Sequence, residues 1–430
     1  MNVIDSALKR ADQTKAVIIG EGTISQVGEL FKRQFPDKRA IVIADPNTFA
    51  AAGKQVYETF QSQNVKQDEP FILDDSNLYA EYRYIDILTN RFQETNSIPV
   101  AVGSGTINDL TKLSSYNRVR PYMVVATAAS MDGYTAYGAS ITLHGSKQSI
   151  KCDAPQACLA DTAIIAKAPS AMTASGYADL FAKITAGADW ILAEELGVEP
   201  IEPFAWSVVQ DGLKAALADP QGARAGNESA IRPLIEGLLL GGFAMQAAKT
   251  SRPASGAEHQ FSHLWDMEHL KFNGKTPSHG FKVGVGMCAV TALYARLINS
   301  DMGKLNVDRC LEAWPTFEKQ QADALAQFAD SDIPTLGAKE TAAKYPSQGQ
   351  LRDQLLRLKT NWDHIKSRLL GQLIPLDEVK RRLKLVGAPT EPEEIGVSPE
   401  RMKKSFLRAQ MIRRRFTVLD VALRTGNLDT

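Results

Sequence analysis

The stretch that decides the fold is Val100-Ala101-Val102-Gly103-Ser104-Gly105-Thr106-Ile107-Asn108-Asp109-Leu110. An apolar β-branched run, a glycine turn and a helically spaced segment follow one another, which predicts a strand, a tight turn and a helix. Gly103 and Gly105 let the backbone approach a ligand, and Ser104 or Thr106 can cap the helix, whose first N–H groups favour an anion such as a pyrophosphate. Position 108 is Asn, so the G-x-G-x-x-G pattern is incomplete and a turn without a ligand stays an alternative.

The same alternation of strand and helix runs through the first 130 residues. Parallel strands joined by right-handed crossovers are the expected arrangement, with ligands beyond the carboxyl ends of the strands. The predicted strands are Ala16–Ile19, Ala40–Ala44, Phe71–Leu73, Val100–Val102 and Tyr122–Ala126, and the predicted helices are Ile24–Phe35, Phe49–Gln61, Tyr79–Phe92 and Ile107–Tyr116.

From about Thr173 onward the apolar spacing is that of helices, and strand-like runs are nearly absent. The sequence therefore predicts an α/β fold joined to an all-α one. The predicted domains are a parallel-sheet α/β domain over residues 1–170 and an all-helical domain over residues 171–430.

Composition excludes several classes of protein. The 49 basic and 49 acidic side chains cancel, so no nucleic-acid partner or anionic membrane surface is expected. The four cysteines show no CxxC spacing, which argues against a disulfide scaffold or a zinc ribbon. No uninterrupted apolar run of about 18 residues predicts a membrane span. The start, Met1-Asn2-Val3-Ile4-Asp5, does not resemble a signal peptide, so a cytoplasmic location is expected.

Asp45 ends the second predicted strand and is a candidate for the adenosine ribose. An acid at that place in a dinucleotide fold accepts hydrogen bonds from ribose hydroxyls and repels a 2′-phosphate, which favours NAD(H) over NADP(H). The competing interpretation is an Asx turn that precedes Pro46.

Histidines cluster late in the chain. Of six histidines, four fall in a short window: His259, His263, His269 and His279. His259 and His263 are four residues apart and share one face of a helix. Imidazoles that converge with a carboxylate make a catalytic metal site with a position open for substrate. Asp179, flanked by apolar residues, is the preferred carboxylate, and Asp189 is the weaker candidate.

Four separated motifs occur in one order: Gly103–Asp109, Ala126–Gly133, Arg252–His259 and Ser278–Gly280. Together they resemble the iron-containing alcohol dehydrogenase and glycerol dehydrogenase-like superfamily over about residues 14–300, with the best match to its sn-glycerol-1-phosphate dehydrogenase branch. The resemblance implies a dehydroquinate synthase-like architecture. Residues 1–170 would form a Rossmann-like dinucleotide-binding domain, residues 171–430 would form a helical domain that binds metal and substrate, and the active site would lie in the cleft between them.

The resemblance also implies roles for individual residues. Asp179, His259 and His279 match the ligands of one divalent metal, zinc or nickel rather than iron. Asp132 matches a residue that contacts substrate, and His263 matches a second active-site histidine. The positions that match the coenzyme site are Asp45, Gly103, Ser104, Gly105, Thr106, Asp109, Thr127 and Ser130.

The implied activity is hydride transfer between NAD(H) or NADP(H) and carbon 2 of a three-carbon phosphate, which interconverts dihydroxyacetone phosphate and sn-glycerol 1-phosphate. Arg252 is a candidate for the substrate phosphate, with Lys271 and Lys275 as further cations. A homodimer is expected by analogy. The alternatives are a dehydrogenase of glycerol or another free polyol, a dehydroquinate synthase, and a non-catalytic relative.

Overall fold

The computed structural model describes residues 3–143 and 146–428. The predicted candidates lie within this part, except that His144 and the first two residues of the stretch Met1–Asp5 lie outside it. Two compact units emerge from the contacts: unit 1 comprises Met1–Leu180, Ser207–Ser251 and Leu385–Gly387, and unit 2 comprises Phe181–Trp206, Arg252–Lys384 and Ala388–Thr430. This division differs from the predicted domains 1–170 and 171–430, because α13 (Glu228–Ala248) packs against α1, β1 and α7 of unit 1.

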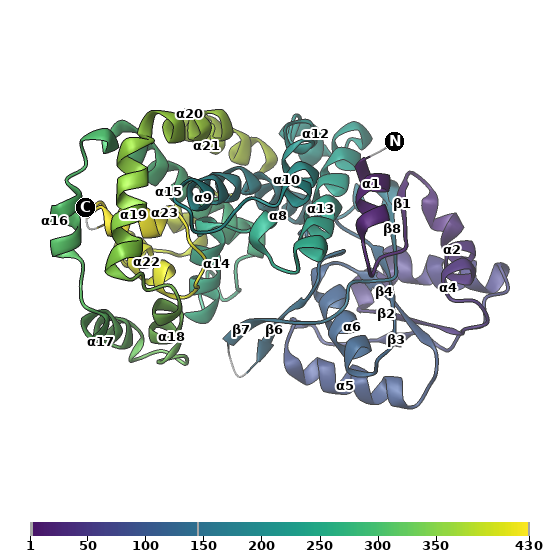
Figure 1. Ribbon diagram of the computed structural model, residues 1–430. Coiled ribbons are helices and arrows are strands. Elements are labelled where there is room, and N and C mark those ends of the chain that lie inside the picture. Colours follow the sequence, from purple (N-terminus) through teal and green to yellow (C-terminus); the bar gives the residue numbers. More distant parts are fainter. Residues whose placement is uncertain (1–2, 144–145, 429–430) are drawn as a thin grey trace. The chain divides into compact units, whose positions relative to one another are not determined.

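Unit 1 is built on a six-stranded sheet with the order β1-β8-β5-β4-β2-β3, in which every pair is parallel (Figure 1). All five predicted strands are present, and the α/β prediction is confirmed. Sequence analysis missed β8, a short apolar run that lies between β1 and β5 in the sheet. The strands are β1 Ala16–Gly20, β2 Ala40–Ala44, β3 Phe71–Ile72, β4 Ile98–Gly103, β5 Met123–Ala126 and β8 Ala157–Asp161.

The central strands β2, β4, β5 and β8 are buried along their whole length, as expected where helices cover both faces of a parallel sheet. A separate antiparallel hairpin is formed by β6 (Ala139–Leu143) and β7 (Ser146–Ile150). The helices that begin in unit 1 are α1 Val3–Arg10, η1 Thr23–Gln26, α2 Val27–Gln34, α3 Pro46–Thr48, the π-helical turn η2 Phe49–Gly53, α4 Lys54–Ser62, α5 Tyr82–Gln93, α6 Gly105–Asn117, α7 Thr162–Ile165, α8 Ser170–Phe181, α11 Leu213–Ala216, α12 Pro220–Ala225 and α13.

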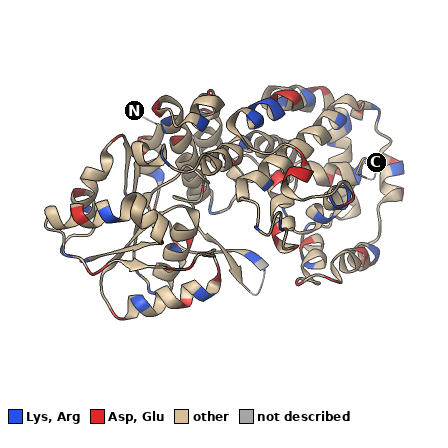
Figure 2. Cartoon of the chain, turned by 180° about the vertical axis from the view of Figure 1, so that it is seen from behind, with Lys and Arg blue, Asp and Glu red and all other residues tan. Residues whose placement is uncertain are grey.

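All named elements among the described residues of unit 2 are helices, as predicted, and an isolated antiparallel bridge joins Phe272 and Lys275. Its elements are α9 Lys183–Glu195, α10 Pro203–Gln210, η3 Arg252–Ala254, α14 Ala257–Met267, α15 His279–Asn299, η4 Met302–Lys304, α16 Val307–Ala313, α17 Phe317–Phe328, α18 Leu336–Ala343, α19 Gln348–Thr360, α20 Trp362–Gln372, α21 Leu376–Val386, η5 Pro392–Ile395, α22 Pro399–Met411 and α23 Val418–Arg424. α10 and α21 each cross a unit boundary. Basic and acidic side chains are interspersed along these helices, in keeping with the net charge of zero (Figure 2).

The core of unit 2 surrounds α15. By length and composition this helix could cross a membrane, with a mean hydropathy of 1.5 over its best window, which the sequence expectation had not recognised. Of that window 67% is buried inside the protein. Its apolar side chains pack with those of α9, α14, α22 and α23 in one cluster, so α15 is a core helix of unit 2.

Candidate metal centre

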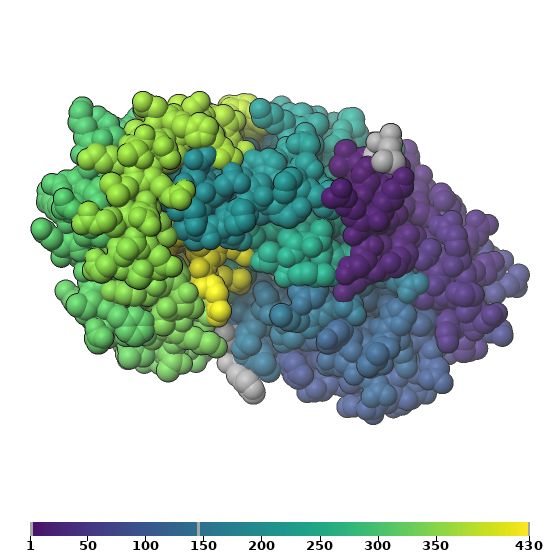
Figure 3. Space-filling model, viewed as in Figure 1, coloured from purple at the N-terminus to yellow at the C-terminus, as the bar shows by residue number. Residues whose placement is uncertain are grey.

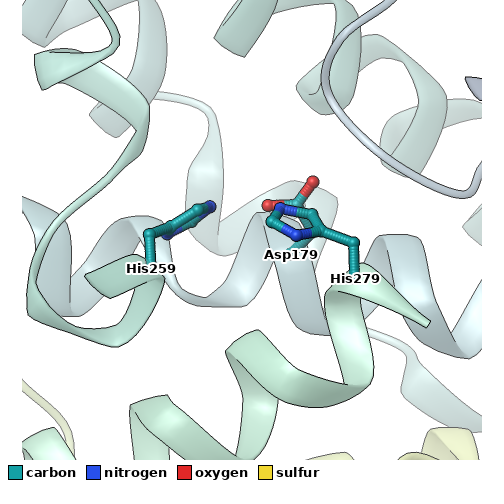
Figure 4. Close-up of side chains that lie close together, drawn as sticks. All are labelled: Asp179, His259 and His279. Atoms are coloured by element: carbon teal, nitrogen blue, oxygen red, sulfur yellow. The ribbon is translucent and has the colours of Figure 1, made fainter. Parts of the chain in front are cut away.

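Three side chains from distant parts of the sequence gather at one point. Asp179 of α8, His259 of α14 and His279 of α15 each offer a ligand atom, and these atoms all lie within 4.8 Å of one another. Figure 4 shows the two imidazoles and the carboxylate turned toward one another. Asp179 and His259 are buried, and His279 is half-buried. One carboxylate and two imidazoles are donors that suit a divalent transition metal and leave a coordination position open.

A glycine brings α8 into position. A Cβ on Gly176 would lie 2.0 Å from the carbonyl oxygen of Ala129, so only glycine allows the helix to approach this loop so closely. Asp179 lies three residues further, on the same face of the helix. Its Oδ2 accepts a hydrogen bond from the backbone N–H of Asp132, at 3.1 Å. The predicted substrate-contacting residue therefore adjoins the predicted carboxylate ligand.

A buried carboxylate orients His259. Glu258 Oε1 lies 2.7 Å from His259 Nδ1, and the Glu258 side chain also accepts hydrogen bonds from Thr185 Oγ1 and the backbone N–H of Gly256. Burial raises the pKa of Glu258, but the hydrogen bond and charge of His259 and the Gly256 N–H outweigh it, so the pKa lies below its usual value. A carboxylate on Nδ1 selects the tautomer that presents the Nε2 lone pair to a metal.

His279 is oriented in a similar way. It is the first residue of α15, whose N-cap Ser278 accepts a hydrogen bond from Phe281 N–H. The hydroxyl of Ser262, on α14, lies 3.3 Å from His279 Nδ1. A Cβ on Gly286 would lie 2.7 Å from the Glu258 carbonyl oxygen, so α14 and α15 approach closely.

The other histidines of the cluster separate into two environments. His263 is buried on α14, and its ring centroid lies 6.4 Å from that of His259 and 6.1 Å from that of His279. His269 follows α14 on the exposed surface and pairs with Asp332. The structure thus brings His263 beside the candidate ligands and places His269 away from them.

The glycine loop joins β4 to α6 as predicted. Ser104 occupies the N-cap position, but its side chain accepts no hydrogen bond from the first N–H groups of α6. A Cβ on Gly103 would lie 2.6 Å from Ile107 Cβ, and one on Gly105 would lie 3.2 Å from Met131 Cγ. Gly103 is therefore required for packing of the strand against its own helix, a role that the sequence interpretation did not include.

A buried lysine fixes the loop beyond Asp132. Lys112 of α6 is fully buried, and its Nζ donates to the backbone carbonyls of Gly133, Ala136 and Gly138 at 2.8, 3.0 and 3.1 Å. Asp109, one turn earlier, lies 3.7 Å from the same Nζ. The helix that starts at the glycine loop thereby also holds the segment that follows the predicted substrate residue.

Three further predicted coenzyme residues lie in or beside this region. Asp109 Oδ2 accepts the backbone N–H of Ser140 at 3.0 Å and so attaches β6 to α6. Burial raises the pKa of Asp109 against the opposing effect of Lys112. Thr127 is buried, with its N–H bonded to the Gly103 carbonyl, and the Ser130 carbonyl accepts from Ser175 Oγ. Contacts of these three residues with a coenzyme stay a prediction.

Asp45 makes the turn that was the competing interpretation. Its Oδ1 accepts from Asn47 N–H and Thr48 N–H, and Thr48 Oγ1 accepts from the Asp45 backbone N–H at 3.0 Å, which completes a capping box. The capping role of Asp45 is thus observed, and the ribose role remains a prediction.

Arg252 is placed inside unit 2 rather than on an open surface. Its side chain is 1% exposed, donates to the carbonyls of Phe416 and Asp189 at 2.9 Å each, and pairs with Glu199 at 3.2 Å. Burial and these protein partners show a structural role for Arg252, and its contact with the substrate phosphate stays a prediction. Lys271 and Lys275 are exposed on the segment that leads to α15.

Sequence reasoning missed Lys112, Glu258 and Ser262. Glu258 lies within a motif that was recognised, and an acid beside a histidine in an apolar helix is a usable signal for an orienting carboxylate. Lys112 offered a weaker signal, a lysine among buried positions of α6. Ser262 offered none, because its role depends on the packing of two helices.

Comparison with known proteins decides the family. Residues 18–169 match the family model of iron-containing alcohol dehydrogenases. A glycerol-1-phosphate dehydrogenase (NAD(P)+) of Geobacillus thermodenitrificans is 32% identical, over 89% of this chain and 86% of the relative. The chain belongs to the iron-containing alcohol dehydrogenase family. A relative of the same name from Pyrococcus furiosus is 34% identical to this family member, over 65% of this chain and 78% of the relative. The membership predicted from the four motifs is confirmed.

Solved structures agree on the fold of this iron-containing alcohol dehydrogenase family member. A probable glycerol dehydrogenase from Sinorhizobium meliloti superposes with a TM-score of 0.59 at 16% identity, covering 97% of this chain and 96% of the other. The NADH-dependent butanol dehydrogenase A of Thermotoga maritima gives a TM-score of 0.60 at 13% identity, covering 97% of each chain. These likenesses confirm the predicted architecture and nothing finer.

Proposed function

We propose that the protein is a metal-dependent sn-glycerol-1-phosphate dehydrogenase, which interconverts dihydroxyacetone phosphate and sn-glycerol 1-phosphate with NAD(H) or NADP(H). The observation that carries the proposal is the convergence of Asp179, His259 and His279 in a chain whose relatives, at 30% identity or more over most of its length, are named for this activity. The same convergence argues against a non-catalytic relative.

Asp179, His259 and His279 would hold the metal. The donor set fits a divalent cation, and the Glu258 carboxylate on His259 Nδ1 is the outer contact expected at such a site. When bound, the cation would polarise the C2–O bond of the substrate. Two imidazoles with one carboxylate suit Zn²⁺, Ni²⁺ or Fe²⁺ by ligand type. The resemblance to the glycerol-phosphate branch favours Zn²⁺ or Ni²⁺ over Fe²⁺.

The coenzyme would lie at the carboxyl ends of the parallel strands, with its pyrophosphate at the glycine loop. Support comes from the N-terminus of α6, where the Ser104 side chain makes no capping hydrogen bond to the first turn. Thr127 and Ser130 follow β5, the strand next to β4, and would adjoin the nicotinamide half. The coenzyme supplies or accepts the hydride, and the chain supplies orientation and a dry environment.

Asp132 and His263 would act on the substrate. The backbone N–H of Asp132 donates to the Asp179 carboxylate, which holds Asp132 in place. Its side chain would accept a hydrogen bond from a substrate hydroxyl. His263, buried beside His259 and His279, would pass the proton of the C2 hydroxyl to or from solvent. A cytoplasmic homodimer is part of the proposal by analogy with enzymes of this kind.

The test is an assay of NADH oxidation by protein depleted of metal and then reloaded separately with Zn²⁺, Ni²⁺ or Fe²⁺. Dihydroxyacetone phosphate should be reduced at least about 100-fold more efficiently than dihydroxyacetone, since charge-assisted hydrogen bonds to a phosphate contribute about 3 kcal/mol. Equal rates with the two ketones would support the free-polyol alternative and reject this proposal. In the reverse direction, NAD⁺ reduction with sn-glycerol 1-phosphate but not its enantiomer is expected.

A further inference from the structure

Asp189 is buried within unit 2 and joins four parts of it. Its Oδ1 accepts hydrogen bonds from the Tyr294 hydroxyl at 2.6 Å and the Val418 N–H at 2.8 Å, and its Oδ2 accepts from the Ala257 N–H at 2.7 Å. These donors belong to α15, to the chain just after Thr417, and to α14, while Asp189 itself lies on α9. It was the weaker candidate ligand in the sequence, and it lies outside the three-residue group.

The contact with Ala257 concerns the metal centre directly. Ala257 is the first residue of α14, two residues before His259, and the first N–H groups of a helix have no partner within it. Thr185, one turn before Asp189 on α9, donates to Glu258, the carboxylate on His259. One face of α9 therefore holds both the start of α14 and the residue that orients its histidine.

The C-terminal segment, defined here as residues 415–418, lies along the same helix start. Arg415 donates to the Ser255 carbonyl at 2.6 Å, Arg252 donates to the Phe416 carbonyl, and Thr417 Oγ1 lies 3.3 Å from Gln260 Oε1. Phe416, Thr417 and Val418 are buried. Only a small yellow patch of the late C-terminal residues reaches the face seen in Figure 3.

A displacement of this start would reach His259 through short links. Gly256 N–H donates to Glu258 Oε1, the same oxygen that contacts His259 Nδ1. A Cβ on Gly256 would lie 2.5 Å from Asp189 Oδ2, so the turn is packed directly against this carboxylate. Loss of the Asp189 contacts would therefore loosen the turn, the orienting Glu258 and the imidazole together.

We propose that Asp189 is a positioning residue of the metal centre and that, through Val418, it makes the C-terminal segment part of that centre. The inference rests on the proposed function, which assigns the metal to His259. The inference gives a role to a part of the chain beyond residue 300, where no motif was recognised. The C-terminal segment packs against the start of α14 and so holds the helix that carries His259 in position.

The experiment measures Zn²⁺ affinity of the metal-depleted full chain by competition with a chelator, together with the Tm of the metal-free protein. Asp189→Asn keeps the side-chain shape but has only one oxygen that can accept hydrogen bonds, so one of the two groups of donors loses its acceptor. Its Zn²⁺ affinity should fall about 10-fold or more, the range found for outer contacts of metal sites. Tyr294→Phe removes one of the three contacts, so its Zn²⁺ affinity should lie between that of Asp189→Asn and that of the wild type.

Ser405→Ala is the matched control. It removes a buried hydrogen bond to Trp265 at the far end of α14 and should lower the Tm while the Zn²⁺ affinity stays at the wild-type value. Wild-type Zn²⁺ affinity in Asp189→Asn would overturn the inference. If that variant fails to fold, wild-type affinity in Tyr294→Phe overturns it instead. A wild-type chain that binds no metal would defeat the proposed function, which is a different result.

Discussion

Each unit holds a functional segment in place with a buried ionisable side chain, which is a lysine in unit 1 and an aspartate in unit 2. In unit 1, the Lys112 ammonium donates to three carbonyls of residues 133–138, just beyond Asp132. In unit 2, the Asp189 carboxylate accepts from two backbone N–H groups and a tyrosine hydroxyl, just before His259. The sign of the charge follows the backbone group that the segment leaves unsatisfied.

This difference has a physical origin in local structure. An irregular loop that turns away from a sheet exposes several carbonyls to the interior, and a single ammonium has three donors to satisfy them. A helix start exposes N–H groups, and a carboxylate has two oxygens to accept from them. Both arrangements bury a charge, which is tolerated only when it is fully hydrogen-bonded. Perturbing either should therefore have a large and local effect.

The largest effect is expected when the metal ligand His259, which the Asp189 contacts hold in position, is removed. His259→Ala should abolish stoichiometric metal binding and lower kcat/KM at least about 1000-fold, because several kcal/mol of charge stabilisation depend on the metal. Elemental analysis and the NADH assay measure the two effects, and circular dichroism checks that the fold is kept. Full turnover by a metal-free variant would show that the ligand assignment is wrong.

The unit 1 arrangement is tested by Lys112→Met, which keeps the side-chain length and removes the charge. Three carbonyls and Asp109 would lose their buried cation, so the free energy of unfolding should fall by about 3–5 kcal/mol. Thermal denaturation measures the loss. Zn²⁺ affinity should change less than in Asp189→Asn, and the KM for dihydroxyacetone phosphate should rise as the segment beyond Asp132 loosens. An unchanged Tm would show that Lys112 does not hold this loop.

Glu258→Gln sharpens the comparison by removing charge without removing shape. The neutral amide can still accept from His259 Nδ1, but more weakly, so Zn²⁺ affinity should fall about 10-fold, toward the lower end of the effects of outer contacts. Thr185→Val is the control, since it removes a second partner of Glu258 and leaves the contact with His259. A larger effect in the control than in Glu258→Gln would assign the role to packing.

The smallest expected effect compares two helix starts, one in each unit. Ser398 caps α22 by accepting from Arg401 N–H, whereas Ser104 makes no side-chain cap on α6. Ser398→Ala should cost about 1 kcal/mol of stability and Ser104→Ala less than about 0.5 kcal/mol. Urea denaturation measures both. A loss of NADH affinity in Ser104→Ala at unchanged stability would support a ligand at the N-terminus of α6. Equal destabilisation in the two variants would contradict the observed difference between a capped α22 and an uncapped α6.

Sequence reasoning succeeded where local pattern determines the structure. The strand at Ile98–Gly103 and the helix after it follow from an apolar run and a glycine turn, and His259 and His263 share a face because they are four residues apart. The α/β unit and the helical unit were both predictable for this reason. Asp179 could be selected because an apolar neighbourhood makes an unpaired carboxylate costly.

Features that depend on packing between distant segments could not be predicted from the sequence. The role of Asp189 is one of them, because its three hydrogen-bond donors come from segments far apart in the chain. Arg252 lies in a recognised motif, yet its guanidinium is directed at backbone carbonyls. The return of α13 to unit 1 could not be read from its helical spacing, which is the same in either unit.

The bare backbone at Gly176 sets a limit on how this sequence can vary. Any residue with a Cβ there would meet the Ala129 carbonyl and push α8 off its loop. Asp179 would then be displaced along with the helix, although the substitution touches no candidate ligand. A survey of homologous sequences could use this position as a filter, because a chain that keeps all three ligands but has a side chain at 176 would have to build the centre by another route.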